Sequence, residues 1–448
     1  AVAIGRAAAP LGAAEVVDGM VTVVWGDPPP GGEFEPEPLM HVTTADGESV
    51  RLAFDPSLFE HVVAMGPGAT VRVSGNLADD GSLQVDSLVR LGTRETQRAL
   101  TGAQPWVSLL CRFKDTSDPS YGLGYFVSMF DNTPGRLDHY WREVSYDNIN
   151  IVGSTAVGWV ELPKTRTDYA NNGWNLSELF DDCTAAADHL VDFSDAGGGA
   201  PFVGLNLMFN DDLDGYAWGG TRPATLDGLW RIWSVTWEPP WGWRNVCVMA
   251  HEMGHGMGLP HSNNWDGDSS PYDNVWDVMS DTWSYAASDA TYGTIGKHTI
   301  GYHKYDRLGW IPSAKVYEPA PDSAAWVEID DMALPSVANY RMAKLPIPGT
   351  DDHYTVEVRG KTGHYDARLP DKAVIIHHVD TSRREDAWAV DTAVPPGNNS
   401  AGEGTMWRAG ETFEDAAAQI TVTVDSQTTN GFRLRILYGD ASDIFGDG

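Results

Sequence analysis

Hydrophobic and polar residues alternate along the first hundred positions, which is the pattern of strands with one buried face. The turn-forming stretches DPPPGG, ADG and ADDG divide this region into short segments. We expect strands within 16–26, 39–54, 70–77 and 82–91, with two strands in the second of these ranges. Five strands within residues 15–92 predict a small closed barrel of the OB type. His41 stands alone in an alternating stretch and is expected to be an ordinary strand residue.

The segments on either side of this barrel differ in pattern. Residues 1–14 are small and nearly uncharged, and we interpret them as the flexible start of a processed chain. Residues 93–104 are polar and contain Arg94 and Arg98, which is typical of an exposed linker and a processing site. The barrel is therefore interpreted as either a retained accessory domain or an inhibitory pro-domain.

Strand and helix patterns then mix over residues 105–315, which predicts a second domain. Residues 137–146 have the period of a short amphipathic helix, and residues 175–193 show the clearest helical spacing of apolar positions. Strands are expected within 149–162, 202–211 and 229–239. A helix over 244–258 follows the last of these strands. The fold class predicted for the whole chain is α+β.

Alternation returns in residues 316–448, where six strand-like stretches separated by turns predict a C-terminal β-sandwich. His377 and His378 are adjacent in one of these strands, so their side chains point to opposite faces. That geometry is unsuited to binding one metal ion, and both are interpreted as structural residues. The loop 391–404 is expected to be mobile.

Composition narrows the possible partners. The chain has 63 acidic and 30 basic residues and a formal net charge of −33, which argues against nucleic acid and anionic membranes as partners. No apolar run is long enough to span a membrane. Three cysteines are too few for a disulfide scaffold, and Cys247 is interpreted as a buried apolar residue. Asp211, Asp212 and Asp214 could bind calcium, although a solvated turn is the favoured interpretation because the spacing is not that of an EF-hand.

The stretch HEMGHGMGLPHS, residues 251–262, carries the chemistry. On a helix, His251 and His255 leave the same face one turn apart, as two zinc ligands require. Glu252 beside them is a candidate general base. Gly258 can adopt positive φ, end the helix and return the chain, so that His261 becomes the third ligand. Three ligands leave one tetrahedral position open, which indicates a catalytic rather than a structural zinc site.

Residues 251–261 match the extended zinc motif of the metzincin endopeptidases, and Met279 in DVMS matches their Met-turn. The stretches GLPHS, YDNVWDVMS, AWGG and HKYDRLGWI narrow this resemblance to the gametolysin and immune-inhibitor-A-like secreted metalloproteases. The resemblance implies a mixed sheet, two long helices above a cleft, and AWGG (217–220) near the edge strand that aligns the substrate. Asp281 stands where some metzincins have a tyrosine, so no fifth, tyrosine ligand is expected.

These observations predict a secreted zinc-dependent endopeptidase that acts on protein or peptide substrates, with Glu252 activating a water molecule. The alternative is a binding or adhesion protein with a vestigial zinc domain. Residues 1–104 contain no cysteine, so a cysteine cannot block the zinc from this region. An aspartate could replace it, but the sequence does not single one out. Substrate specificity and oligomeric state are also open at this level.

Overall fold

We describe the protein from a computed structural model, which is of mixed α+β class and contains a closed five-stranded barrel and several further sheets. The structure describes residues 14–32, 38–54, 69–91, 99–117, 120–171, 174–265, 271–392 and 402–440. The N-terminal segment 1–13, the linker arginines Arg94 and Arg98, and most of the loop 391–404 lie outside the described residues, as do 266–270.

The N-terminal barrel contains the five strands β1 (Ala14–Asp27), β2 (Leu39–Thr43), β3 (Ser49–Ala53), β4 (Thr70–Leu77) and β5 (Leu83–Arg90). Their order is β2-β3-β5-β4-β1, and β1 also pairs with β2, which closes the barrel as predicted. Alternate apolar residues such as Val21, Val23, Val71 and Val73 fill its core, because successive side chains of a strand point to opposite faces. His41 lies in β2.

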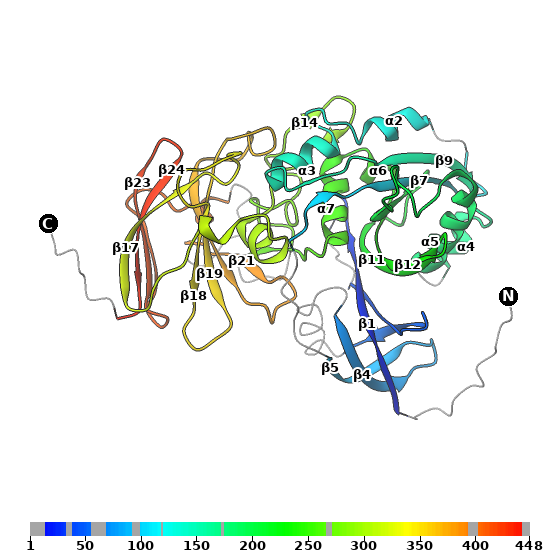
Figure 1. Ribbon diagram of the computed structural model, residues 1–448, viewed down its shortest axis with the longest axis horizontal. Coiled ribbons are helices and arrows are strands. Elements are labelled where there is room, and N and C mark those ends of the chain that lie inside the picture. Colours follow the sequence, from blue (N-terminus) through cyan, green and yellow to red (C-terminus); the bar gives the residue numbers. More distant parts are fainter. Residues whose placement is uncertain are drawn as a thin grey trace.

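Strand β1 is longer than the barrel requires, and its last four residues leave it. Residues Val24 to Asp27 pair antiparallel with Gly220 to Ala217 of β11 (Ala217–Leu226). One ten-stranded sheet therefore runs from the barrel into the central domain, and Figure 1 shows β1 rising from the barrel beside β11.

The central part of this sheet has the order β11-β12-β10-β7-β9. Its other strands are β7 (Trp106–Arg112), β9 (Thr155–Glu161), β10 (Gly204–Phe209) and β12 (Leu229–Glu238). These four strands are parallel to one another. Within this part only β11 runs antiparallel, and a tight turn connects its end to the start of β12. The sequence pattern did not predict strand β11, because Pro223 and a run of small residues obscure the alternation; the resemblance placed AWGG only near an edge strand.

Helices cover both faces of this sheet. The helices are α2 (Leu123–Ser128), α3 (Leu137–Ser145), α4 (Arg166–Ala170), α5 (Leu176–Ala187), α6 (Pro240–Trp243) and α7 (Val246–Gly256). Along β7, Trp106 and Leu110 pack with α3 and α7, whereas Val107 and Leu109 pack with α5. The alternation of the strand thus separates two cores, with α5 on the face opposite α7.

The C-terminal region forms two sheets over one shared core. The first has the order β13-β21-β20-β19-β18-β16, and the second β17-β24-β23-β22. Their strands are β13 (Asn263–Asn264), β16 (Val316–Tyr317), β17 (Ser323–Asp330), β18 (Met342–Pro346), β19 (His353–Arg359), β20 (Ala373–Val379), β21 (Ala387–Ala389), β22 (Thr412–Asp415), β23 (Ile420–Gln427) and β24 (Gly431–Tyr438). Side chains from β17 to β20 and β22 to β24 interdigitate between the sheets.

Strand β13 follows the zinc motif directly, yet it pairs with β21 of the C-terminal sheet. The segment after the motif is therefore part of both regions. At the other end, the short strands β6 (Gly102–Ala103) and β8 (Ile149–Asn150) pair in parallel, so the last linker residues are attached to the central domain.

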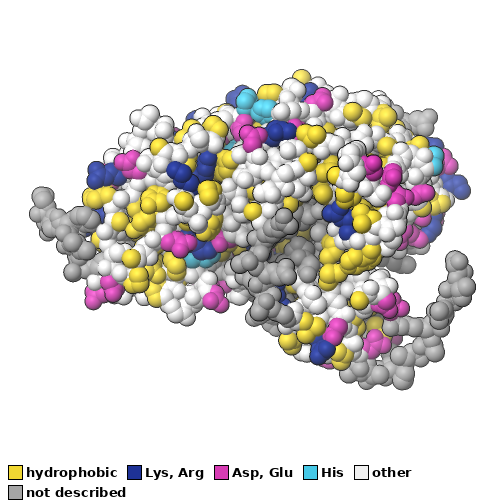
Figure 2. Space-filling view, in the orientation of Figure 1, with side chains coloured by type: hydrophobic (Ala, Val, Ile, Leu, Met, Phe, Trp, Pro, Cys, Tyr) yellow, Lys and Arg dark blue, Asp and Glu magenta, His cyan; other side chains and the backbone are white. Residues whose placement is uncertain are grey.

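No helix among the described residues is long and apolar enough to cross a bilayer. Figure 2 shows acidic side chains distributed over the barrel, the central domain and the C-terminal sheets on the visible face, with Lys and Arg among them.

Candidate metal centre

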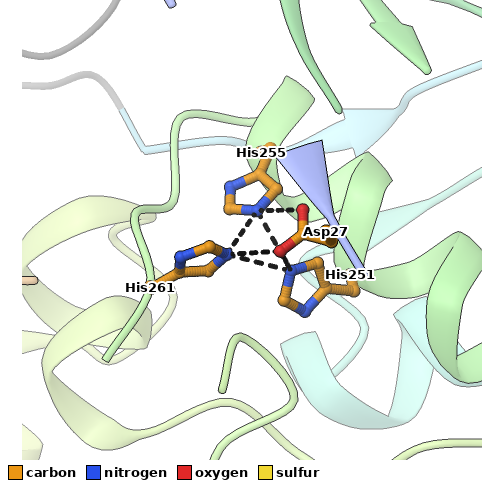
Figure 3. Close-up of side chains that lie close together, drawn as sticks. All are labelled: Asp27, His251, His255 and His261. Carbon is orange, nitrogen blue, oxygen red and sulfur yellow. Dashed lines mark hydrogen bonds and ion pairs between the residues drawn. The ribbon is translucent and has the colours of Figure 1, made fainter. Parts of the chain in front are cut away.

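Helix α7 presents His251 and His255 on one face, one turn apart, as their spacing predicts. The helix ends because Gly258 has φ +91°, and the Leu259 amide donates to the Gly254 carbonyl at 3.0 Å. The chain then turns back and brings His261 opposite the helix, so that the three rings converge as Figure 3 shows. The three Nε2 atoms lie 3.1, 3.1 and 3.3 Å apart.

Hydrogen bonds at the far side of two rings set their tautomers. Nδ1 of His251 lies 2.7 Å from the Val278 carbonyl oxygen, and Nδ1 of His255 lies 2.8 Å from that of Leu259. A carbonyl only accepts, so each Nδ1 carries the proton and each Nε2 presents its lone pair to the centre. Burial lowers the pKa of His255 to about 3, so this ring is neutral near pH 7.

Three converging lone pairs repel one another unless a cation lies between them. Nitrogen ligands about 2.0–2.1 Å from a tetrahedral zinc ion are separated by about 3.3–3.4 Å. The observed separations of 3.1–3.3 Å are close to this value. The three histidines therefore fit a zinc ion, although their geometry alone does not identify the metal.

Asp27, the last residue of β1, completes this cluster. Its Oδ1 lies 2.8 Å from His261 Nε2 and 3.2 Å from His251 Nε2, and its Oδ2 lies 3.4 Å from His255 Nε2. The residue is only 5% exposed. Burial raises the pKa of Asp27, but the imidazoles of His251 and His261 outweigh burial and hold it well below its usual range. The described residues thus provide three nitrogens and one carboxylate around a single point.

Glu252 is fully buried beside the cluster, and neither carboxylate oxygen accepts a hydrogen bond from a described residue. Burial, and then the charges of Asp27 and Glu238, raise the pKa of Glu252 well above its usual range. A hydrogen bond with Asp27 also contributes to this raised pKa, so the two buried carboxyl groups interact directly. The position of Glu252 is suited to exchanging a proton with a group bound at the centre.

Met279 lies beneath helix α7, as the resemblance implies. A Cβ atom on Gly254 would lie 2.5 Å from Met279 Sδ, so the small residue in the motif makes room for this side chain. The preceding residue, Val278, accepts the hydrogen bond from His251, which ties the turn to the ligand. Asp281 accepts hydrogen bonds from the backbone of Trp283 and Ser284, a turn-stabilising role.

Two aromatic residues cover the centre. Trp25 stacks on His255, with ring centroids 5.3 Å apart and planes 14° apart. The Tyr272 hydroxyl donates to Asp27 Oδ1 at 2.9 Å. Beside them, a cavity of about 260 Å³ is lined by residues 27–32 together with Glu252, Trp241 and Trp283. Residues of the N-terminal domain thus form one wall of the cavity next to Glu252.

The close contact between β11 and α7 requires glycine at position 219. A Cβ atom there would lie 2.4 Å from the Glu252 backbone oxygen and 2.7 Å from its Cα, neither of which can move independently. We expect Gly219→Ala to lower the free energy of unfolding by about 1–3 kcal/mol and to weaken metal binding, as overpacking does. Gly124→Ala in α2 is the control, because no atom lies within 4 Å of its Cβ position. Thermal unfolding and metal content measure both; equal effects of the two substitutions would contradict this role of Gly219.

Other predicted candidates do not join the centre. His377 is buried in β20 against Asn274, and His378 lies near Arg383, in keeping with structural roles. Cys247 is a buried free thiol. In the acidic turn, Arg166 binds Asp214 at 2.7 Å and also contacts Asp212. Because Arg166 already supplies positive charge to this turn, a solvated turn stays the favoured interpretation. Calcium binding there stays a prediction.

The sequence interpretation missed Asp27, Trp25, Glu238 and Tyr272. Glu238 is buried near Glu252, and burial is the main cause that raises its pKa to about 8. The only local signal for Asp27 was its position between a long apolar strand and three prolines.

No protein-family model matches this chain, and no curated protein matches it significantly, so the assignment of the metal centre depends on its geometry.

Proposed function

We propose that the protein is a zinc-dependent endopeptidase. The observation that carries this proposal is the convergence of three Nε2 atoms within 3.1–3.3 Å of one another, beside the buried carboxyl group of Glu252. His251, His255 and His261 would hold the ion. Glu252 is the one buried acid that the motif places next to the ligands without making it a ligand.

Zinc, when bound, would lower the pKa of a water molecule towards about 7 and polarise the scissile carbonyl group. Glu252 would accept a proton from a water molecule beside it and return that proton to the leaving nitrogen. Burial raises the pKa of Glu252. A carboxylate with a raised pKa accepts a proton more readily, and the acid that it forms can then donate the proton to the leaving nitrogen. The carbonyls of Val278 and Leu259 keep the ligand rings oriented.

The fold also supports the narrower assignment to metzincin-like peptidases. The mixed sheet, the zinc helix on one face and Met279 beneath it support this assignment. The two longest helices, α5 and α7, lie on opposite faces of the sheet and not together above a cleft, which departs from what the resemblance implies. AWGG forms the start of β11 next to the zinc helix, and residues 24–27 of β1 pair with it there in the way that an extended peptide would. With this assignment we also propose a secreted protein that acts on protein or peptide substrates.

The alternative of a vestigial zinc domain in a binding protein has less support. If catalysis had been lost, a buried acid at position 252 would no longer be needed. A residue that packs there at lower energetic cost would then be expected in its place. Glu252 is still present and fully buried.

Metal removal tests the proposal. We expect about one zinc ion per chain by elemental analysis. We also expect casein hydrolysis by protein that trypsin has cleaved in the linker 93–104, which contains Arg94 and Arg98. Phenanthroline should abolish the hydrolysis and added zinc should restore it. His255→Ala should lose the zinc, whereas His189→Ala, outside the site, should keep it. Nicked protein that contains zinc yet cleaves neither casein nor a peptide library would refute the proposed function.

A further inference from the structure

The end of β1 lies where an extended substrate strand would lie. Antiparallel to β11, Val24 pairs with Gly220, Trp25 with Gly219, Gly26 with Trp218 and Asp27 with Ala217. Gly220 allows this approach, since a Cβ atom there would lie 2.1 Å from the Val23 carbonyl oxygen. The edge of β11 beside the centre is therefore paired with the chain's own N-terminal domain and is not exposed to a substrate.

The barrel holds this strand rigidly. Residues Ala14 to Met20 of β1 pair with β4, and Met20 to Val24 pair with β2, before the strand reaches β11. Pro28 follows Asp27 and has no backbone N–H, so the ladder ends at the residue that reaches the histidines. The barrel thus fixes the end of β1, so that the carboxylate of Asp27 is held at one position beside the histidines.

That carboxylate fills the fourth position of the site. Its two oxygens lie 2.8–3.4 Å from the three Nε2 atoms, and the Tyr272 hydroxyl orients Oδ1. In the described part of the chain, its ion-pair partners are these imidazoles and no Lys or Arg. A buried carboxylate without a Lys or Arg partner is costly, and a cation held among the four groups would stabilise it.

We infer that the N-terminal domain is a built-in inhibitor, in which Asp27 is the fourth metal ligand and β1 occupies the substrate position along β11. This inference rests on the proposed function, because a blocked site matters only if the open site is catalytic. The carboxylate stands in place of the water, and Trp25 covers His255. Residues 28–32 continue along the cavity beside Glu252.

Covalent attachment makes such an inhibitor effective. A tethered domain competes with substrate at an effective concentration in the millimolar range, so dilution does not release it. Release requires cleavage between the barrel and the central domain, or a change that separates β1 from β11. If the closed state is populated to about 99%, a small ligand of the metal binds about 100-fold more weakly than to the open state.

The test replaces Asp27 in the full chain and measures the metal rather than proteolysis. With cobalt in place of zinc, Asp27→Ala should change the visible absorption spectrum and bind acetohydroxamate at least about tenfold more tightly than the wild type. Asp18→Ala is the matched control, because Asp18 lies on the same strand but forms an exposed pair with Arg72 at 2.5 Å. It should leave both the spectrum and the affinity unchanged. An Asp27→Ala protein with the wild-type spectrum and acetohydroxamate affinity overturns the inference.

A second variant decides the question if Asp27→Ala does not fold. Gly220→Ala leaves all four candidate ligands intact but forces β1 away from β11, because the new Cβ atom collides with the backbone of Val23 and Val24. We expect tighter acetohydroxamate binding here too, and wild-type affinity would overturn the inference. Casein hydrolysis separates the two proposals. Variants that bind acetohydroxamate tightly yet cleave nothing refute the proposed function, whereas a wild-type full chain as active as Asp27→Ala refutes the inhibitor.

Discussion

Replacing Glu252 with Gln is expected to lower peptide hydrolysis by about 10²–10⁴-fold while the metal stays bound. The amide has nearly the shape of the carboxyl group, so the packing around helix α7 should be preserved. It cannot accept the proton of the attacking water, and the step that depends on this transfer is lost. None of the three candidate zinc ligands changes.

The measurement compares Glu252→Gln with the parent in two backgrounds, the wild-type chain and Asp27→Ala, so that a blocked site cannot conceal the effect. Zinc content and thermal midpoint are recorded for each protein. Glu161→Gln is the control, because Glu161 is an exposed acid at the end of β9 that pairs with Arg112 at 2.6 Å. Hydrolysis by Asp27→Ala/Glu252→Gln at the rate of Asp27→Ala alone would exclude Glu252 as the base.

Replacing Arg359 with Ala is expected to lower the free energy of unfolding by about 3–5 kcal/mol. Arg359 lies in β19 and is fully buried. It donates to Asp366 at 2.9 and 3.0 Å and to Glu357 at 3.2 Å. It also donates to the backbone carbonyls of Trp276 and His298 in the central domain. Removing the guanidinium takes away the one cation that these two buried carboxylates bind, and it leaves them, among the described residues, only the backbone N–H groups of His298 and Gly301.

Calorimetry should show a thermal midpoint lower by at least about 5 °C for Arg359→Ala. Arg408→Ala is the control, because Arg408 is partly exposed where it pairs with Glu403 at 2.6 Å. Exposed pairs contribute about 0–1 kcal/mol, so its midpoint should shift little. Equal shifts would mean that Arg359 does not stabilise the junction between the Met-turn segment and the C-terminal sheets.

This junction gives the C-terminal region a role in the metal centre. Trp276, three residues before Met279, is held by Arg359, and its indole N–H donates to Thr405 at 2.7 Å. Strand β13, directly after His261, pairs with β21. The segment that carries His261 and Met279 is thus fastened at both ends to the C-terminal sheets. We expect truncation of those sheets to loosen the site rather than leave it intact.

Local patterns in the sequence were sufficient for the histidines, because their geometry depends on short-range rules. A four-residue spacing on a helix places His251 and His255 together, and Gly258 at φ +91° returns the chain to His261. The barrel was predictable for a similar reason, since alternation and turn residues define short antiparallel strands. The separate faces of His377 and His378 follow from the same alternation.

Tertiary structure alone decided which residue fills the fourth position. The position of Asp27 between an apolar strand and three prolines does not reveal its role, because that role depends on a pairing with β11 far along the chain. That pairing exists because Gly220 leaves room at the outer edge of β11 for the backbone of Val23 and Val24, and because β1 extends beyond the barrel until Pro28 ends it. The sequence by itself thus determined the positions of the three histidines and Glu252 and the existence of the barrel, which depend on local spacing. Long-range strand pairing decided that the barrel closes the site.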